Sequence, residues 1–150
     1  MKPATLQTDD QTLSTRRHLA APPERVWQAF ADPLQLARWW GPDGFSNVFE
    51  RFDFQTGGAW HFWMVGPDGQ RHWNENRFDM LQPPHRIELA HVVAPRFTLT
   101  VTLTPEAGGT QLAWAQRFET AELCRALEAI CLPANEQNLD RLGAVLAGAA

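Results

Sequence analysis

The sequence contains no tyrosine and only two cysteines, Cys124 and Cys131. On a helix, their seven-residue separation places them about two turns, or roughly 10 Å, apart, which is too far for a disulfide bond. The pair also lacks the C-x-x-C spacing that is typical of zinc sites and redox motifs. The cysteines therefore fit a reducing compartment, and Cys131 is expected to behave as a small buried hydrophobic residue.

Long hydrophobic runs are missing as well. No apolar stretch approaches the roughly 18 residues that suggest a membrane-spanning helix. Residues 1–17, MKPATLQTDDQTLSTRR, are polar and contain no apolar segment of the kind found in secretory signal peptides. We expect a cytoplasmic protein without membrane insertion.

The chain has no excess of positive charge. It carries 13 lysines and arginines against 17 aspartates and glutamates, which gives a net charge of −4. The basic residues are scattered singly, apart from Arg16 and Arg17. This balance argues against nucleic acid, and against an anionic membrane surface, as a partner.

Motifs for metal binding and nucleophilic catalysis are absent. The spacings H-x-H, H-E-x-x-H and C-x-x-C do not occur, and neither does G-x-S-x-G. His61, His72 and His91 fall on three different predicted strands, with His61 facing away from the other two. Glu136 would serve as a general base only if it were buried. We therefore predict no metal and no cofactor, and we assign no catalytic residue.

What the sequence does have is a high aromatic content in a short chain. Its 150 residues are 44% hydrophobic and include seven tryptophans and nine phenylalanines. This length suffices for one domain with one core. We expect a flexible N-terminal tail over residues 1–11 and a single domain over residues 12–150. Composition alone leaves two interpretations open: a bulky core, or a cavity walled by large flat side chains.

Turn residues and periodicity predict a strand, two short helices, six strands and a long helix. The first strand is expected over 12–20, and the helices over 21–33 and 34–40, punctuated by prolines. The next strands are short alternating segments between Gly and Pro turns, typical of a meandering antiparallel sheet. They are expected over 47–54, 59–65, 71–81, 86–92, 96–104 and 110–118. Gly57 and Gly58 are expected to form a bend at the start of the strand over 59–65.

From Thr120 onward, apolar residues recur at helical spacing. The stripe predicted to face the sheet consists of Leu123, Leu127, Ile130, Ala134, Leu142 and Val145. Pro133 is expected to kink or break this helix. A sheet that buries one face needs a partner, and the chain offers one long amphipathic helix. We therefore predict an α+β fold in which the sheet curls around the C-terminal helix.

Several segments carry a resemblance to a known family. They are APPERVWQAFADP (21–33), RWWGPDGF (38–45), GGAWHFWM (57–64), GPDG (66–69), PPHRIELAH (83–91) and ANEQNLDRLGAVLA (134–147). In this order they span nearly the whole chain. The sequence resembles the START-like (SRPBCC) superfamily and, within it, bacterial proteins similar to the C-terminal domain of the activator of heat-shock protein 90 ATPase.

The resemblance implies a helix-grip fold. In this fold a curved antiparallel sheet, here of about six or seven strands, wraps around a long C-terminal helix, and two short helices follow the first strand. Such folds often leave a cavity between the sheet and the helix. Members include lipid carriers, polyketide cyclases and co-chaperone domains, so the resemblance leaves the activity open.

Alternation along one strand indicates which polar residues point inward. In the strand over 71–81, Phe78 and Met80 are expected to face the core. The same parity turns His72, Asn74 and Asn76 to that face. A set of uncharged polar groups is therefore expected on the inner side of the sheet.

The other strands and the helix extend this set. On the helix, Asn138 falls near the centre of the apolar stripe, with Cys131 and Asn135 beside it. Apolar walls with a few polar groups are typical of a small-molecule site. The predicted ligand site consists of Trp40, Trp60, Phe62, Met64, Asn74, Asn76, His91, Trp114, Gln116, Leu127, Cys131, Asn138 and Leu142.

Trp39 and Trp40 stand directly before the Gly-Pro-Asp-Gly turn. Adjacent residues on a helix differ in direction by about 100°. We therefore predict that one is buried under the mouth of the sheet and the other is partly exposed over the turn. Trp39 is favoured as the buried one, because it lies three residues after Leu36 on the same helical face. Trp40 is then the candidate for a doorway to the cavity.

The leading hypothesis is a non-enzymatic domain that binds a small, mostly apolar or aromatic molecule between the sheet and the helix. We expect it to be a monomer or a homodimer. One alternative is a cyclase or dehydratase that transfers protons through His91 or His72. Another is a co-chaperone-like interaction module without an internal ligand. The inward amides and imidazole would then bond to one another, to the backbone or to buried water.

Overall fold

The computed structural model describes residues 9–148. Residues 1–8 of the predicted tail lie outside the described residues, as do residues 149–150. The elements follow the predicted order: β1 (Thr12–Leu19), α1 (Pro23–Ala31), α2 (Pro33–Trp39), β2 (Ser46–Phe52), β3 (Ala59–Val65), β4 (Arg71–Gln82), β5 (Arg86–His91), β6 (Phe97–Glu106), β7 (Gly109–Phe118) and α3 (Ala121–Leu146). Just before β1, Gln11 donates from Nε2 to the carbonyl oxygen of Phe118 at 3.0 Å.

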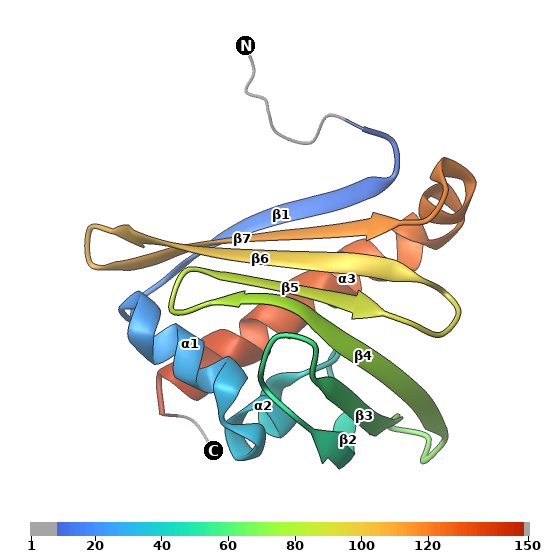
Figure 1. Ribbon diagram of the computed structural model, residues 1–150, viewed down its shortest axis with the longest axis horizontal. Coiled ribbons are helices and arrows are strands. Elements are labelled where there is room, and N and C mark those ends of the chain that lie inside the picture. The colour runs from blue at the N-terminus through green and yellow to red at the C-terminus, as the bar shows by residue number, and fades with distance from the viewer. Residues whose placement is uncertain (1–8, 149–150) are drawn as a thin grey trace.

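The seven strands form one sheet in the order β1-β7-β6-β5-β4-β3-β2. Every neighbouring pair is antiparallel, and the last strand, β7, lies between β6 and the first strand, β1. Figure 1 shows the sheet curving over α3, which crosses behind it, while α1 and α2 lie toward one end. This is the predicted α+β helix-grip arrangement.

Capping residues set the helix boundaries. Asp32 ends α1 and begins α2, because its backbone N–H donates to the Gln28 carbonyl at 2.9 Å while its Oδ1 accepts from the Leu34 amide at 3.0 Å. Thr120 caps α3, with its Oγ1 accepting from the Leu123 amide at 3.0 Å. Such caps satisfy amides that the first turn of a helix leaves unpaired. They fix where α3 begins relative to β7.

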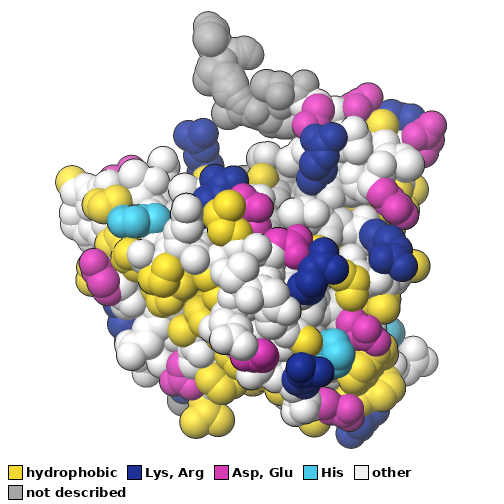
Figure 2. Space-filling view, viewed as in Figure 1, with side chains coloured by type: hydrophobic (Ala, Val, Ile, Leu, Met, Phe, Trp, Pro, Cys, Tyr) yellow, Lys and Arg dark blue, Asp and Glu magenta, His cyan; other side chains and the backbone are white. Residues whose placement is uncertain are grey.

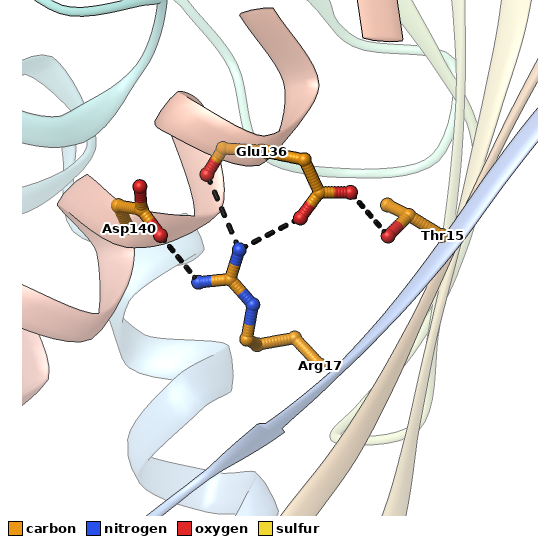
Figure 3. Close-up of polar contacts among 4 residues, drawn as sticks. All are labelled: Thr15, Arg17, Glu136 and Asp140. Atoms are coloured by element: carbon orange, nitrogen blue, oxygen red, sulfur yellow. Dashed lines mark hydrogen bonds and ion pairs between the residues drawn. The ribbon is translucent and has the colours of Figure 1, made fainter. Parts of the chain in front are cut away.

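A polar network attaches α3 to the edge strand β1 (Figure 3). The Arg17 guanidinium lies 2.8 Å from Glu136 Oε1 and 2.8 Å from Asp140 Oδ1, and the Thr15 hydroxyl donates to Glu136. The two carboxylates are one helical turn apart, so one guanidinium spans both. These side chains are partly exposed, and each ion pair contributes about 1 kcal/mol or less. The carboxylate of Glu136 is therefore engaged by Arg17 and Thr15 at the edge of the sheet.

Strand β4 contains a bulge that changes the predicted alternation. The pairing with β5 shifts register between Phe78 and Met80, so that Leu81 pairs with Ile87. A bulge adds one residue and reverses the parity of the side chains that follow it. Leu81 accordingly packs against the core. The prediction that Met80 faces the core is wrong, since Met80 pairs with the outward-facing Glu88.

Helix α3 departs from the predicted stripe in its N-terminal half. Ile130 is 66% exposed, so its predicted place in the buried stripe is wrong. The buried face is centred near Cys124 and Leu142, and Ile130 points more than about 90° away from that line. Pro133 was expected to kink or break the helix; α3 continues through it as one helix, so the break does not occur.

The turn that leads into β3 requires glycine at two positions. Gly57 has a positive φ of 85°, and its amide donates to the Phe78 carbonyl at 2.6 Å. A Cβ on Gly58 would lie 2.0 Å from the carbonyl oxygen of Asp53. The predicted bend is therefore a tight turn, and Gly58 is required because no side-chain atom fits there.

Charged side chains of both signs are intermingled on the face shown in Figure 2. On the outer side of the sheet, opposite charges lie next to each other, as in the pairs Arg77–Asp79 and Arg86–Glu88. Within residues 9–148, no helix combines the length and the apolar character needed to cross a bilayer.

Candidate functional site

A cavity of about 270 Å³ lies between the sheet and α3, beside the turn that follows α2. Its wall includes most of the predicted site residues: Trp40, Met64, Asn74, Asn76, His91, Trp114, Gln116, Cys131 and Asn138. The rest of the wall is formed by Gly41, Pro42, Pro95, Phe97, Leu99, Ala134 and Asn135. The fold thus brings together side chains from β3 to β7, α3 and the turn after α2. A depression of about 440 Å³ over β1, β6 and β7 is larger, but its wall comes from the sheet alone, whereas the cavity is walled by both the sheet and α3.

Four predicted site residues are not on the cavity wall. Trp60, Phe62 and Leu142 are buried in the main core. Leu127 is partly buried and packs against a separate small cluster that contains Leu13, Phe118 and Cys124. The inward direction of these side chains was predicted correctly for the strands. Direction alone does not show whether a side chain reaches the cavity or is covered by its neighbours.

The cavity wall also includes residues that were not among the predicted site residues. Phe97 and Leu99 alternate with threonines along β6, and Asn135 was placed beside Asn138, so the sequence carried a signal for them. Pro95 comes from the loop after β5. Its position depends on the conformation of that loop, which periodicity does not predict.

His91 has a protein oxygen within hydrogen-bonding distance of each ring nitrogen. Nδ1 lies 2.7 Å from the carbonyl oxygen of Pro95, and Nε2 lies 2.9 Å from Asn74 Oδ1. The imidazole also stacks on Phe97, with ring centroids 4.8 Å apart. Burial lowers the pKa of His91, and the nearby positive charge of Arg96 lowers it further. A proton transfer to substrate would require the ring to give up one of these partners.

Three other wall amides bond to the protein through one atom each. Asn135 Nδ2 donates to Gln116 Oε1 at 3.0 Å, which joins α3 to β7. Asn138 Nδ2 donates to the Trp39 carbonyl at 2.8 Å, which joins α3 to the end of α2. These bonds fix the orientation of the amides and leave their other polar atoms free.

Two buried wall residues carry a polar atom without a partner. Asn76 and Trp114 are both buried, and neither Asn76 Oδ1 nor Trp114 Nε1 has a hydrogen-bond partner within residues 9–148. A buried polar group without a partner costs about 1–3 kcal/mol. Each such group in a native core calls for an explanation.

Trp39 and Trp40 are both buried, with 0% and 8% of their surface exposed. Trp39 belongs to the core and donates from Nε1 to the Ala29 carbonyl at 3.0 Å. Trp40 lines the cavity and contacts Trp60 and Trp114, with centroid distances of 4.9 and 5.8 Å. The prediction that one tryptophan is partly exposed over the turn is wrong. Trp40 is the C-cap of α2 with extended backbone, so the 100° helical offset does not apply to it.

Arg141 holds the turn after α2 against α3. Its guanidinium donates to the carbonyl oxygens of Arg38, Trp40, Gly41, Pro42 and Phe45, at 2.8 to 3.2 Å. Burial lowers the pKa of Arg141, although a guanidinium stays charged near neutral pH. This contact positions Trp40, Gly41 and Pro42, which form one side of the cavity.

His61 and His72 lie off the cavity wall, whereas the thiol of Cys131 lies on it. His72 is exposed and His61 lies on the outer side of the sheet, 4.0 Å from Glu75. No group of three or more potential metal ligands occurs in the described chain. Cys131 is a free thiol on the cavity wall, and burial raises its pKa. A thiol of raised pKa is a poor nucleophile.

Comparisons with known proteins identify a family and solved structures that are similar to this chain. The family described as Activator of Hsp90 ATPase homolog 1-like protein matches residues 20–147. A crystal structure of a protein from Chromobacterium violaceum is 32% identical and superposes with a TM-score of 0.80, covering 89% of this chain and 96% of that one. A crystal structure from Rhodobacter sphaeroides is 30% identical, with a TM-score of 0.84 and coverage of 93% and 94%.

A crystal structure from Nitrosomonas europaea shares the fold at 21% identity, with a TM-score of 0.86 over 96% of this chain and 99% of that one. No curated protein sequence matches the chain. The family match extends from the end of β1 to the end of α3 and thus includes every element that forms the cavity. The chain therefore belongs to the family of Activator of Hsp90 ATPase homolog 1-like proteins and has the START-like (SRPBCC) fold.

Proposed function

We propose that the protein binds a small, mostly apolar molecule in the cavity between the sheet and α3. The observation that carries this proposal is the composition of the wall. Trp40, Phe97, Leu99 and Trp114 give a large apolar surface, and a few amides and one imidazole converge on the same space. Apolar walls with a few fixed polar groups are the usual form of a small-molecule site.

The size of the cavity limits the ligand. Drug-sized molecules occupy pockets of roughly 300–1,000 Å³, whereas benzene fills an apolar cavity of about 150 Å³. A cavity of about 270 Å³ lies between these, which favours a compact molecule over a long-chain lipid. Predicted site residues outside the wall, such as Leu127, contribute packing in this account rather than ligand contacts.

The two alternative functions find less support. A cyclase or dehydratase would need a free acid or base, and a protein oxygen lies within hydrogen-bonding distance of each ring nitrogen of His91. A co-chaperone-like module needs no internal ligand, and it leaves the apolar wall and the fixed amides of the cavity without a role. Ligand binding accounts for both features.

Native mass spectrometry of the freshly purified protein tests the proposal. Ala134 lies on the cavity wall, so Ala134→Phe should fill part of the space. Ala129 is on the exposed side of the same helix, and Ala129→Phe is the matched control. We expect a bound small-molecule mass with the parent and with Ala129→Phe, and its loss with Ala134→Phe. If the same mass stays bound to folded Ala134→Phe, or if none of the proteins carries one, the proposal fails.

A further inference from the structure

The amides around the cavity leave a specific set of hydrogen-bonding atoms unused. Gln116 accepts through Oε1 from Asn135 Nδ2, and Asn138 donates through Nδ2 to the Trp39 carbonyl. In the described chain, Gln116 Nε2, Asn135 Oδ1 and Asn138 Oδ1 therefore have no hydrogen-bond partner. The same part of the wall thus presents one donor and two acceptors.

Charge is the second constraint on a ligand. Within residues 9–148, the wall contains no Asp, Glu, Lys or Arg side chain. A carboxylate only accepts hydrogen bonds, so it would face the unused oxygens of Asn135 and Asn138. An ammonium only donates, so it would face Gln116 Nε2. Either ion would also lose its hydration without a counter-charge, which is costly.

We infer that the cavity selects an uncharged molecule of about ten non-hydrogen atoms, with an aromatic body and one group that both donates and accepts hydrogen bonds, as a carboxamide does. The aromatic body contacts Trp40, Trp114 and Phe97, and the polar group contacts Gln116, Asn135 and Asn138. The inference rests on the proposed function and narrows it to one chemical class.

Four probes of similar size and shape separate the possible chemistries. Benzamide offers a neutral donor and acceptor, benzoate an anion, benzylamine a cation at about pH 7.5, and ethylbenzene no polar group. Each is titrated into the ligand-free protein, and binding is followed by NMR shifts of the backbone amides. We expect benzamide to bind about three- to tenfold more tightly than ethylbenzene, and both charged probes to bind more weakly than ethylbenzene.

A pair of variants assigns the selectivity to the polar wall. Gln116→Met removes the donor at nearly constant volume and should lower benzamide affinity about three- to tenfold, while ethylbenzene affinity stays the same or rises. Gln111 lies on the outward-facing side of the same strand, so Gln111→Met is the control and should change neither affinity. Asn135→Leu gives a second test from the helix side if Gln116→Met folds poorly.

The outcomes distinguish this inference from the proposed function. If ethylbenzene binds as tightly as benzamide, or if benzoate or benzylamine binds more tightly, the inference is wrong while the cavity remains a ligand site. If all four probes fail to bind although a mass co-purifies with the protein, the inferred class and size are wrong. Failure of the probes together with the absence of any co-purified mass would overturn both.

Discussion

At the residue scale, Asn138 shows why an inward polar side chain has more than one role. It lies on the buried face of α3, where an unpaired amide would be costly. Its Nδ2 donates to the Trp39 carbonyl at 2.8 Å, which ties the helix to the end of α2. One half of the amide is therefore structural, and only the oxygen is left to face the cavity.

Asn138→Leu should lower the free energy of unfolding by about 1–3 kcal/mol, because the Trp39 carbonyl would be buried without its donor. The measurement is urea unfolding followed by circular dichroism. Gln137→Leu is the control, since Gln137 accepts from the amide of the exposed residue Asp43 and should cost less. Equal losses in the two variants would contradict a structural role for Asn138.

His91 should make the stability depend on pH. Burial lowers its pKa in the folded protein, and Arg96 adds to the effect, whereas hydrogen bonds to the carbonyls of Pro95 and Val93 oppose it. The unfolded chain therefore binds the proton more readily than the folded one, and stability falls as pH drops below the ordinary histidine value of about 6.5.

The check is a series of urea midpoints from about pH 8 to about pH 5, for the parent and for His91→Gln. The parent should lose more stability on acidification than the variant does. Parallel curves for the two proteins would show that His91 does not contribute to this dependence.

At the element scale, the cavity depends on how the turn after α2 is attached to α3. Arg141 donates to the backbone carbonyls of this turn, and Asn138 bonds to the residue that precedes it. Trp40 leaves α2 in extended conformation and enters the space beneath the sheet. The side of the cavity formed by Trp40 to Pro42 is thus positioned from the helix.

Arg141→Met should destabilise the protein by about 3 kcal/mol, because several partly buried carbonyl oxygens lose a charged donor. Arg125 is exposed on the same helix, so Arg125→Met serves as the control and should change stability by less than about 0.5 kcal/mol. The unfolding free energies of the two variants are compared in urea. If Arg141→Met costs no more than the control, the guanidinium does not hold the turn.

The turn before β3 gives a second prediction at this scale. A Cβ at Gly58 would lie 2.0 Å from the Asp53 carbonyl oxygen, so Gly58→Val must move the backbone and should cost about 2–4 kcal/mol. Gly143 in α3 has open space around it, and Gly143→Ala should be neutral or stabilising. Thermal unfolding compares the two variants. Unchanged stability in Gly58→Val would rule out the tight turn.

At the scale of the whole molecule, much of the fold was predictable because its signals are local. Alternation in β6 and β7, and the Gly and Pro turns between strands, are set by neighbouring residues. The errors came from features that depend on distant partners. The bulge in β4 placed Leu81 rather than Met80 on the inner face, and the true buried face of α3 excludes Ile130.

The candidate site was predictable to a similar degree. Strand parity placed Asn76, His91 and Gln116 on the inner face, and all three line the cavity. Parity predicts on which face of the sheet a side chain lies, but not whether it reaches the cavity. It therefore did not distinguish the wall residues from Trp60 and Phe62, which are buried in the core. Hydrogen-bond partners, such as the Pro95 carbonyl for His91, depend on loop geometry and were not predictable.

The tryptophans provide a test of the central claim, because they lie on both sides of the sheet. Trp40 and Trp114 line the cavity. Trp63 and Trp73 pack on each other on the outer side, with centroids 4.9 Å apart, and donate to Glu50 and Glu75. Each indole N–H gives its own NMR signal, so the inner and outer pairs can be followed in one sample.

The measurement is the titration of benzamide into the protein, observed through the indole N–H signals after assignment by single Trp→Phe variants. A molecule in the cavity shifts the signals of Trp40 and Trp114 in proportion to its occupancy and leaves those of Trp63 and Trp73 in place. The account predicts this pattern, with the same effect absent in Ala134→Phe. Shifts confined to Trp63 and Trp73, or inner shifts that persist unchanged in folded Ala134→Phe, would contradict a binding site between the sheet and α3.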